Sequence, residues 1–205
     1  MSELSLYLVD TETTSTEIDG DIIEISFYRL STGDQRTWYL KAVNEKKINP
    51  EALRVNGHKL EDITWKTKEG EKKYQLPEEV LPEIENWMAD DEASALDRVL
   101  TGHNIAFDEK HMRELWKRCN SSDTFPFGTH SLDTKSVAIF FDWAAGHNNK
   151  VYSLGRLVKR FGLVKRKAHA AEQDVLMNVD LLNYYKKNFS AKLDNTQNED
   201  ETEEN

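Results

Sequence analysis

The stretch LSLYLVDTETT, residues 4–14, places two acids in what is otherwise an apolar strand pattern. Asp10 and Glu12 are two positions apart. Because side chains alternate between the faces of a strand, these acids share a face with Leu6 and Leu8. Two neighbouring carboxylates disfavour joint ionisation unless a cation lies between them. The stretch therefore predicts either a solvated strand end or a site for a hard divalent metal, whose preferred ligands are carboxylate oxygens.

Two further acids occupy positions where a buried face is expected. Asp108 lies in TGHNIAFDEKHM, at a strand-to-helix junction, and begins a stripe that continues with His111 and Leu115. Asp174 lies in HAAEQDVLMNVDLL, on an apolar helical stripe. Asp108 is also compatible with an ordinary acid of a first helical turn, which the helix dipole favours. Asp174 could also be an ordinary acid at the rim of the apolar face of its helix. Each position taken alone therefore leaves two interpretations open.

His169 precedes Asp174 by five residues. Within one helix that spacing is about 140° out of phase, so the two side chains would not share a face. If the helix starts after His169, the incoming loop can bring its ring to the same site. The alternative is a surface histidine in a basic loop. The other five histidines are interpreted as structural or surface residues.

The coarse pattern of strands and helices indicates a mixed α/β sheet flanked by helices. The predicted strands are Leu4–Asp10, Ile22–Arg29, Gln35–Leu40 and Arg98–Thr101, with SerThrGlyAsp at 31–34 as a hairpin turn. The predicted helices are a short one from Pro50 to Val55, followed by Pro77–Met88, Phe107–Cys119, Asp133–Ala145, Ser153–Phe161 and Ala170–Phe189.

Charge is distributed unevenly along the 205-residue chain, whose net charge is −10. Residues 194–205 contain six acids and no base, so the chain without them carries −4. We expect one folded domain over 1–190 and a disordered acidic tail over 191–205, because the tail has too few apolar residues to pack a core. The tail would serve solubility or dock a partner.

Several features indicate a cytoplasmic protein. No apolar run approaches the roughly 18 residues of a membrane span, and no secretory leader pattern is recognisable, so we expect no membrane partner. The single cysteine, Cys119, rules out a disulfide within the chain and fits a reducing compartment.

A basic segment, LGRLVKRFGLVKRKAH, leads into His169. It provides six cationic side chains: Arg156, Lys159, Arg160, Lys165, Arg166 and Lys167. Such groups contact phosphates and make binding salt-dependent, although a solvated helix face has the same composition. A local patch of this kind would let an acidic protein hold the end of an anionic strand.

DTETT, HNIAFD and HAAEQD, taken together in this order and spacing, resemble the three exonuclease motifs of the DEDDh family. This is the 3′→5′ exonuclease family of the ribonuclease H-like superfold, and the pattern is most similar to the proofreading epsilon subunit of bacterial DNA polymerase III. The resemblance covers about Leu4 to Tyr185, including DIIEISFYRL, INPEALRVNGH and SLDTKSVA. It implies a mixed five-stranded sheet flanked by helices.

The resemblance also implies roles for individual residues. The family's metal-binding carboxylates fall on Asp10, Glu12, Asp108 and Asp174, and its catalytic histidine falls on His169. Its substrate contacts fall on Thr13 and Glu51. Asn56 in RVNGH stands where the epsilon subunit has a histidine, which implies an altered contact with the 3′ end. Asn104 and Phe107 are expected to wedge or stack the terminal base.

The activity implied is two-metal phosphodiester hydrolysis. Two Mg²⁺ or Mn²⁺ ions roughly 3.5–4 Å apart would be bridged by Asp10, with Glu12 and Asp174 on the nucleophile side and Asp108 on the leaving-group side. His169 would accept the proton of the attacking water. The expected reaction releases nucleoside 5′-monophosphates from the 3′ end of single-stranded or frayed DNA, with proofreading beside a polymerase or replication protein as one role.

Two other functions stay open from sequence. One is 3′→5′ RNA trimming of the ribonuclease T or oligoribonuclease type, because the 2′-OH contacts that distinguish RNA cannot be located in one sequence. The other is a non-catalytic module that docks on a polymerase. The complete set of four acids and His169 argues against the docking module.

Overall fold

A five-stranded mixed sheet forms the centre of the part of the chain that the computed structural model describes, residues 4–119 and 125–203, with 190–203 described by backbone alone. Its strands are β1 (Ser5–Thr13), β2 (Ile22–Arg29), β3 (Asp34–Tyr39), β4 (Arg98–Gly102) and β5 (Ser131–Asp133), in the order β3-β2-β1-β4-β5. β1, β2 and β3 pair antiparallel, whereas β4 and β5 continue the sheet parallel to β1. The mixed five-stranded sheet implied by the motif resemblance is therefore confirmed.

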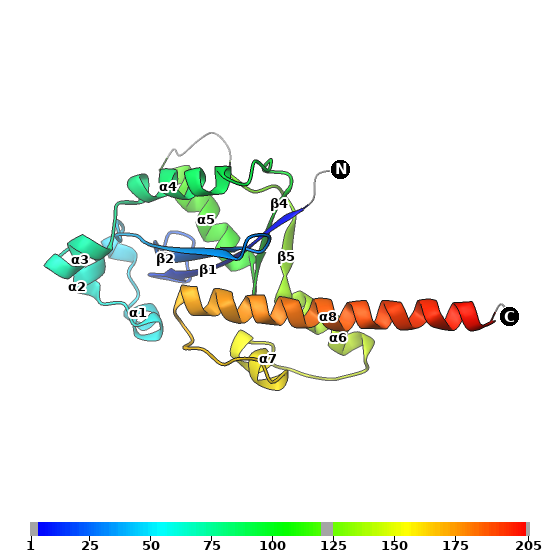
Figure 1. Cartoon of the computed structure of the whole chain (residues 1–205). Coiled ribbons are helices and arrows are strands. Elements are labelled where there is room, and N and C mark those ends of the chain that lie inside the picture. The colour runs from blue at the N-terminus through cyan, green and yellow to red at the C-terminus, as the bar shows by residue number, and fades with distance from the viewer. Residues whose placement is uncertain (1–3, 120–124, 204–205) are drawn as a thin grey trace.

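Helices cover both faces of this sheet (Figure 1). α4 and α5 lie on one face, and the long α8 crosses the other, with α6 and α7 on its side of the molecule. The described helices are η1 (Glu45–Lys47), α1 (Pro50–Asn56), α2 (Leu60–Ile63), α3 (Lys68–Lys73), α4 (Pro77–Ala89), α5 (Ala106–Arg118), α6 (Thr134–Ala144), α7 (Leu154–Arg160) and α8 (Ala171–Glu203).

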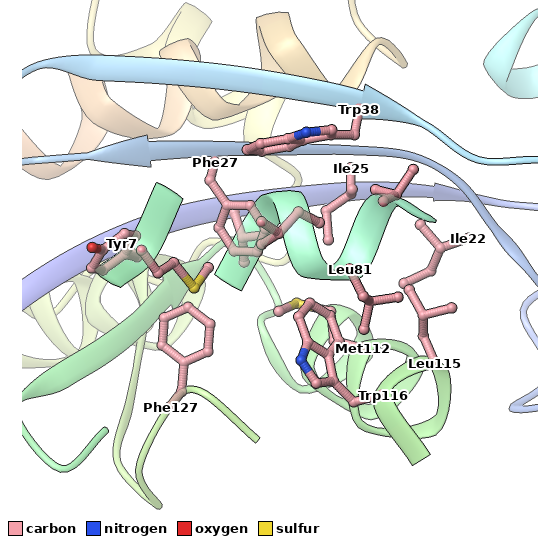
Figure 2. Close-up of a cluster of buried hydrophobic side chains, with 14 of the residues drawn as sticks. Tyr7, Ile22, Ile25, Phe27, Trp38, Leu81, Met112, Leu115, Trp116 and Phe127 are labelled. Atoms are coloured by element: carbon pink, nitrogen blue, oxygen red, sulfur yellow. The ribbon is translucent and has the colours of Figure 1, made fainter. Parts of the chain in front are cut away.

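The main core lies between the sheet and the layer of α4 and α5 (Figure 2). Tyr7 of β1, Phe27 of β2 and Trp38 of β3 point into it from three adjacent strands. Leu81 of α4 and Met112 of α5 meet them from the helices, and both are fully buried. Each such side chain contributes about 1.5–3 kcal/mol by leaving water.

The opposite face of β1 packs against α8. Leu8 is fully buried against Val175 and Val179. Since side chains alternate along the strand, Asp10 and Glu12 continue the Leu8 face and lie on the α8 side of the sheet. The alternation thus positions both acids beneath the first turns of α8.

β1 is longer than its sequence predicts. It continues to Thr13, three residues beyond the predicted end, because Asp10 and Glu12 keep pairing with Ser26 and Glu24 of β2. The two acids therefore belong to a paired strand rather than to a solvated strand end. The short elements β5, α2 and α3 were not predicted, since each offers too few residues for a periodic pattern.

α8 also extends further than predicted. Its backbone is helical to Glu203, through most of the stretch for which a disordered tail is predicted, and the disordered tail stays a prediction. No glycine or proline follows Phe189, so the residues that most often end a helix do not occur in this stretch. Residues 204 and 205 lie outside the described residues. The division at residue 190 stays a prediction.

Among the helices described, none has the length and apolar content needed to cross a membrane. Cys119, the single cysteine, is half-buried as a free thiol at the end of α5. Burial raises the pKa of this thiol, which keeps it protonated.

Candidate active site

The acids of β1 lie where the strand pairing becomes irregular. Glu12 faces Glu24 across the antiparallel ladder, and the register shifts between Glu12 and Thr13. Irregularities of this kind redirect side chains and are common beside active sites. Glu12 is buried and Asp10 is half-buried, so neither behaves as an ordinary surface acid.

Asp108 is held against β1 by two hydrogen bonds. It lies in the first turn of α5 and is 4% exposed. Its Oδ1 accepts from the backbone N–H of Thr11 at 2.9 Å and from the Thr11 hydroxyl at 2.7 Å. The carboxylate therefore joins α5 to the strand that carries Asp10 and Glu12, instead of pointing to solvent from a helix terminus.

Asp174 and His169 approach from the start of α8. The helix begins at Ala171, so His169 lies on the incoming loop, as the phase argument requires. Its backbone has φ of 61°, a left-handed conformation that residues other than glycine adopt mainly where the fold imposes it. The His169 backbone N–H donates to Asp174 Oδ2 at 3.1 Å. One ligand atom from each of Glu12, His169 and Asp174 lies within 4.8 Å of the other two.

Burial is the largest cause of a raised pKa at each of the four acids, and nearby carboxylates add to it. Burial and then the charges of Asp108, Asp174 and Glu12 hold the pKa of Asp10 well above its usual range. Burial and then the charge of Asp174 raise the pKa of Glu12 to about 8. Burial raises the pKa of Asp108 to about 7, against the lowering effect of its Thr11 hydrogen bonds, and it also raises the pKa of Asp174. The site is therefore short of positive charge.

The residues present fit a hard divalent cation. Asp174 Oδ1 is buried and has no hydrogen-bond partner among the described residues, whereas buried carboxylate oxygens are ordinarily satisfied. Carboxylate oxygens are the ligands that Mg²⁺ and Mn²⁺ prefer, and here the carboxylates of Glu12 and Asp174 converge with the His169 ring. A cation would satisfy the orphaned oxygen and offset the mutual repulsion of the acids.

Glu24 is a further acid of this site that the sequence interpretation did not single out. It is 4% exposed on β2 and contributes to the raised pKa values of Asp10, Glu12 and Asp174. His58 Nε2 lies 2.9 Å from its Oε2, and His58 Nδ1 lies 2.6 Å from the Tyr74 hydroxyl. The available signal was an acid inside the apolar run DIIEISF, on the same face as Ser26.

The predicted substrate contacts near β1 divide into two groups. Asn56 Nδ2 donates to the Thr13 carbonyl at 3.1 Å, so these two residues are neighbours at the end of the acid-bearing strand. Glu51 is exposed and engaged by Arg54, whose Nε lies 2.8 Å from Glu51 Oε2. The hydrogen bonds of Glu51 are with Arg54 and with Asn49, the residue before α1, and among the described residues none joins Glu51 to the four acids.

Asn104 and Phe107 lie at the other side of the site, before and within the first turn of α5. Asn104 is exposed with φ of 67°, and its backbone N–H donates to Asp133 Oδ1 at 2.8 Å. Lys135 Nζ donates to Asn104 Oδ1 at 3.2 Å. Phe107 is half-buried and packs on His111, with ring centroids 4.4 Å apart.

The predicted basic patch is not a uniform set of phosphate contacts. Arg160 pairs with the buried Asp142, with its Nη1 2.7 Å from Asp142 Oδ2. Arg166 pairs with Asp180 of α8. These two arginines anchor α7 and the following loop through their ion pairs, and a contact of either with phosphate stays a prediction. Both carboxylates lie far along the chain from their partners, which is why sequence alone did not show the pairs.

The lysine side chains of the same segment are exposed to solvent. Lys159 and Lys165 are exposed, and so is Lys167, two residues before His169. Lys167 and His169 line a cavity of about 410 Å³ together with Glu24 and Asn56. Of the predicted patch, Lys167 is therefore the member that the structure places at the acidic site.

A known protein family and several solved structures are similar to this chain in sequence or fold. The model of a family described as exonuclease, RNase T, matches residues 8–182. No curated protein sequence matches this chain. The fold is similar to Escherichia coli exonuclease I in a zinc-bound complex with single-stranded DNA, with a TM-score of 0.74 and 16% identity over 91% of this chain and 41% of that one.

The fold is also similar to exonuclease I of the moderately thermophilic Methylocaldum szegediense. The TM-score is 0.66, with 18% identity over 86% of this chain and 39% of that one. The chain thus spans about two fifths of the length of these structures. The ribonuclease H-like α/β fold implied by the motifs is confirmed.

Proposed function

This chain belongs to the exonuclease family, and we propose that it is a metal-dependent 3′→5′ exonuclease acting on single-stranded or frayed DNA. The observation that carries the proposal is the convergence of ligand atoms of Glu12, His169 and Asp174 within 4.8 Å of one another, beside an Asp174 oxygen that has no partner among the described residues. The single-stranded DNA in the E. coli exonuclease I structure supports DNA as the substrate.

Asp10, Glu12, Asp108 and Asp174 would hold two Mg²⁺ or Mn²⁺ ions. Bound divalent ions of this kind offset negative charge on a phosphate and favour a water that has lost its proton. The unpaired Asp174 oxygen is free to serve as such a ligand, whereas Oδ1 of Asp108 is already held by Thr11. Asp108 would therefore be the least mobile of the four ligands.

His169 would move the proton. Its backbone is tied to Asp174 while its ring stays exposed, so the imidazole can reach a water at the terminal phosphate. A ring nitrogen would take the proton as the water oxygen bonds to phosphorus and the bond to the 3′ oxygen breaks. The products are a nucleoside 5′-monophosphate and a strand shorter by one nucleotide.

Asn56 and Thr13 would contact the 3′ nucleotide. Their hydrogen bond places the Asn56 amide beside the end of β1, next to the cavity that Lys167 and His169 line. An amide both donates and accepts a hydrogen bond without carrying charge. We therefore expect Asn56 to orient a sugar hydroxyl rather than to neutralise a phosphate.

The experiment that tests the proposal is a time course on matched twenty-nucleotide DNA and RNA strands labelled at the 5′ end. Mg²⁺ is compared with EDTA, and the wild type with Asp10→Ala and Glu78→Gln. Glu78 is an exposed acid in the first turn of α4, across the sheet from the site, and provides the matched control. A ladder shortening from the 3′ end with wild type and Glu78→Gln, but absent with EDTA and Asp10→Ala, is expected.

The rates on the two strands separate the remaining possibilities. Faster shortening of DNA supports the proposal, and a duplex with a mismatched 3′ end then tests proofreading. Faster shortening of RNA would show that RNA, and not DNA, is the preferred substrate. If neither strand is shortened with Mg²⁺ or Mn²⁺, the proposed enzymatic activity is overturned and a docking module is favoured.

A further inference from the structure

One face of α6 exposes large apolar side chains that the proposed catalysis does not use. Ile139, Phe140 and Trp143 are 43%, 57% and 75% exposed. The rings of Phe140 and Trp143 have centroids 6.1 Å apart, so they form one aromatic surface. Exposed apolar groups clustered in this way mark binding surfaces more often than isolated ones do.

The beginning of α6 adjoins the acidic site. The Thr134 hydroxyl donates to Asn178 Oδ1 at 2.7 Å, and Asn178 lies one helical turn beyond Asp174 on α8. Lys135 Nζ donates to Asn104 Oδ1 at the entrance to α5. The exposed face of α6 therefore starts at the edge of the carboxylate site and leads away from it.

Lys135, Ile139 and Trp143 follow one another at intervals of four residues and so form a single stripe along the helix. From Lys135 to Trp143 the helix rises by about 12 Å. At the roughly 3.4 Å rise of stacked nucleotides, that distance corresponds to about three bases. The stripe has the length of a short single strand that extends from the site.

The charge of the surrounding segment favours a polyanion. Residues 134–171 contain eight lysines and arginines and one acid, a net charge of +7 in a chain of −10. The one acid, Asp142, is 3% exposed and paired with Arg160. The surface of this segment therefore presents aromatic rings and several cations, of which Arg160 and Arg166 are paired with Asp142 and with Asp180 of α8.

We propose that the exposed face of α6 binds the upstream nucleotides of the strand whose 3′ end lies in the carboxylate site, with Phe140 and Trp143 stacking on bases. This inference rests on the proposed function for the location of the 3′ end. Aromatic rings beside cationic groups are the features by which proteins hold single strands without reading their sequence. Lys135 is the first cation along the path.

The test compares cleavage of single-stranded oligothymidylates of four and twelve nucleotides by the full chain. The variants are Trp143→Ala and Phe140→Ala, with Trp143→Phe as the conservative replacement. Leu96→Ala is the matched control, because Leu96 is 76% exposed but lies before β4 rather than on α6. The binding of the labelled twelve-nucleotide strand in EDTA is measured in parallel by fluorescence anisotropy.

We expect the wild type to show a lower KM for the longer strand. Trp143→Ala and Phe140→Ala should raise this KM by about 5- to 100-fold, the range for the loss of one stacked base, and leave kcat and the KM for four nucleotides unchanged. Trp143→Phe should retain most of the length dependence. Binding in EDTA should weaken in parallel.

The results distinguish this inference from the proposed function. If the wild type cleaves both strands and the alanine variants keep its length dependence, the α6 face does not bind the strand, and a protein partner becomes its better occupant. If the variants lose activity equally on both lengths, the role of the aromatic pair is structural and the inference is overturned. If the wild type cleaves neither length, the proposed function fails instead, and unchanged binding in EDTA by the variants would overturn the α6 inference as well.

Discussion

Glu24 of β2 lies directly opposite Glu12 of β1 in the antiparallel ladder, and both side chains are buried. His58 holds Glu24 from the other side, with its Nε2 2.9 Å from the carboxylate. Like charges directly opposite each other destabilise a sheet. The pair therefore adds negative potential to a site that already contains Asp10, Asp108 and Asp174, and a cation bound there would relieve it.

Replacement of Glu24 tests whether this acid supports metal binding without being a ligand. We expect Glu24→Gln to raise the Mg²⁺ concentration for half-maximal cleavage by about tenfold, the scale seen when an outer partner of a metal site is removed. The measurement is a Mg²⁺ titration at saturating DNA. Glu78→Gln on α4 should leave the Mg²⁺ requirement unchanged. An unaltered requirement in Glu24→Gln would show that Glu24 serves the fold alone.

The raised pKa of Glu12 predicts how the stability of the metal-free protein depends on pH. Glu12 titrates near 4.5 in the unfolded chain and at about 8 in the folded one. Between these values the folded state binds more protons, so the free energy of unfolding decreases as pH rises. We expect Tm in EDTA to fall from about pH 5 to about pH 8, and Mg²⁺ to raise Tm more at the higher pH.

The control for this pH dependence is Glu12→Gln, which removes the titrating group. Its Tm in EDTA should change less with pH than that of the wild type over the same range. A wild-type Tm that rises between about pH 5 and pH 8 in EDTA would contradict the raised pKa.

The substitution Asp174→Asn is expected to affect thermal stability and cleavage activity in opposite directions. The substitution removes a buried charge whose pKa burial has raised, and it keeps the size of the side chain. We expect the metal-free variant to have a Tm at about pH 8 equal to or above that of the wild type, whereas cleavage falls by orders of magnitude. Thermal unfolding in EDTA and the 3′-end ladder provide the two measurements. A variant that cleaves at near wild-type rate would remove Asp174 from the site.

A test of His169 requires a replacement residue that can adopt the left-handed backbone conformation at this position. Its φ of 61° favours asparagine over alanine, because asparagine enters the left-handed region at lower cost. We expect His169→Asn to lower kcat by about 10²- to 10⁴-fold, as for the loss of a general base, and to change the Mg²⁺ requirement little. Single-turnover cleavage over a range of pH provides the measurement. A large change in the Mg²⁺ requirement with kcat preserved would make His169 a metal ligand instead.

The resemblance of DTETT, HNIAFD and HAAEQD to the exonuclease motifs singled out the four acids and His169, whereas each residue taken alone left a structural interpretation open. Their convergence follows from strand alternation for Asp10 and Glu12 and from the start of α8 for His169 and Asp174. Glu24 was missed because its significance depends on the strand register that sets it opposite Glu12. A single strand sequence contains no information about that register.

The structure also changed the interpretation of residues whose partners are distant in sequence. Arg160 and Arg166 have the composition of a phosphate-binding patch, but tertiary packing gives them Asp142 and Asp180 as partners. The backbone of α8 continues to Glu203 through a stretch without glycine or proline, the residues that most often end a helix. The lack of apolar residues after residue 193 did not by itself predict where α8 ends.

Arg160 is therefore expected to matter for stability more than for DNA binding. Its hydrogen bonds hold the pKa of the Asp142 carboxyl well below its usual range, and removal of the guanidinium would leave a buried carboxylate with the Asn149 amide, the Tyr152 hydroxyl and the His147 ring as its remaining partners. We expect Arg160→Ala to lower Tm by several degrees and to leave the KM for DNA nearly unchanged, whereas Lys167→Ala should raise KM and leave Tm unchanged. Thermal unfolding and cleavage kinetics at two salt concentrations provide the comparison. A lower Tm for Lys167→Ala would give Lys167 the structural role. A weakened salt dependence of cleavage for Arg160→Ala would give Arg160 the role in DNA binding.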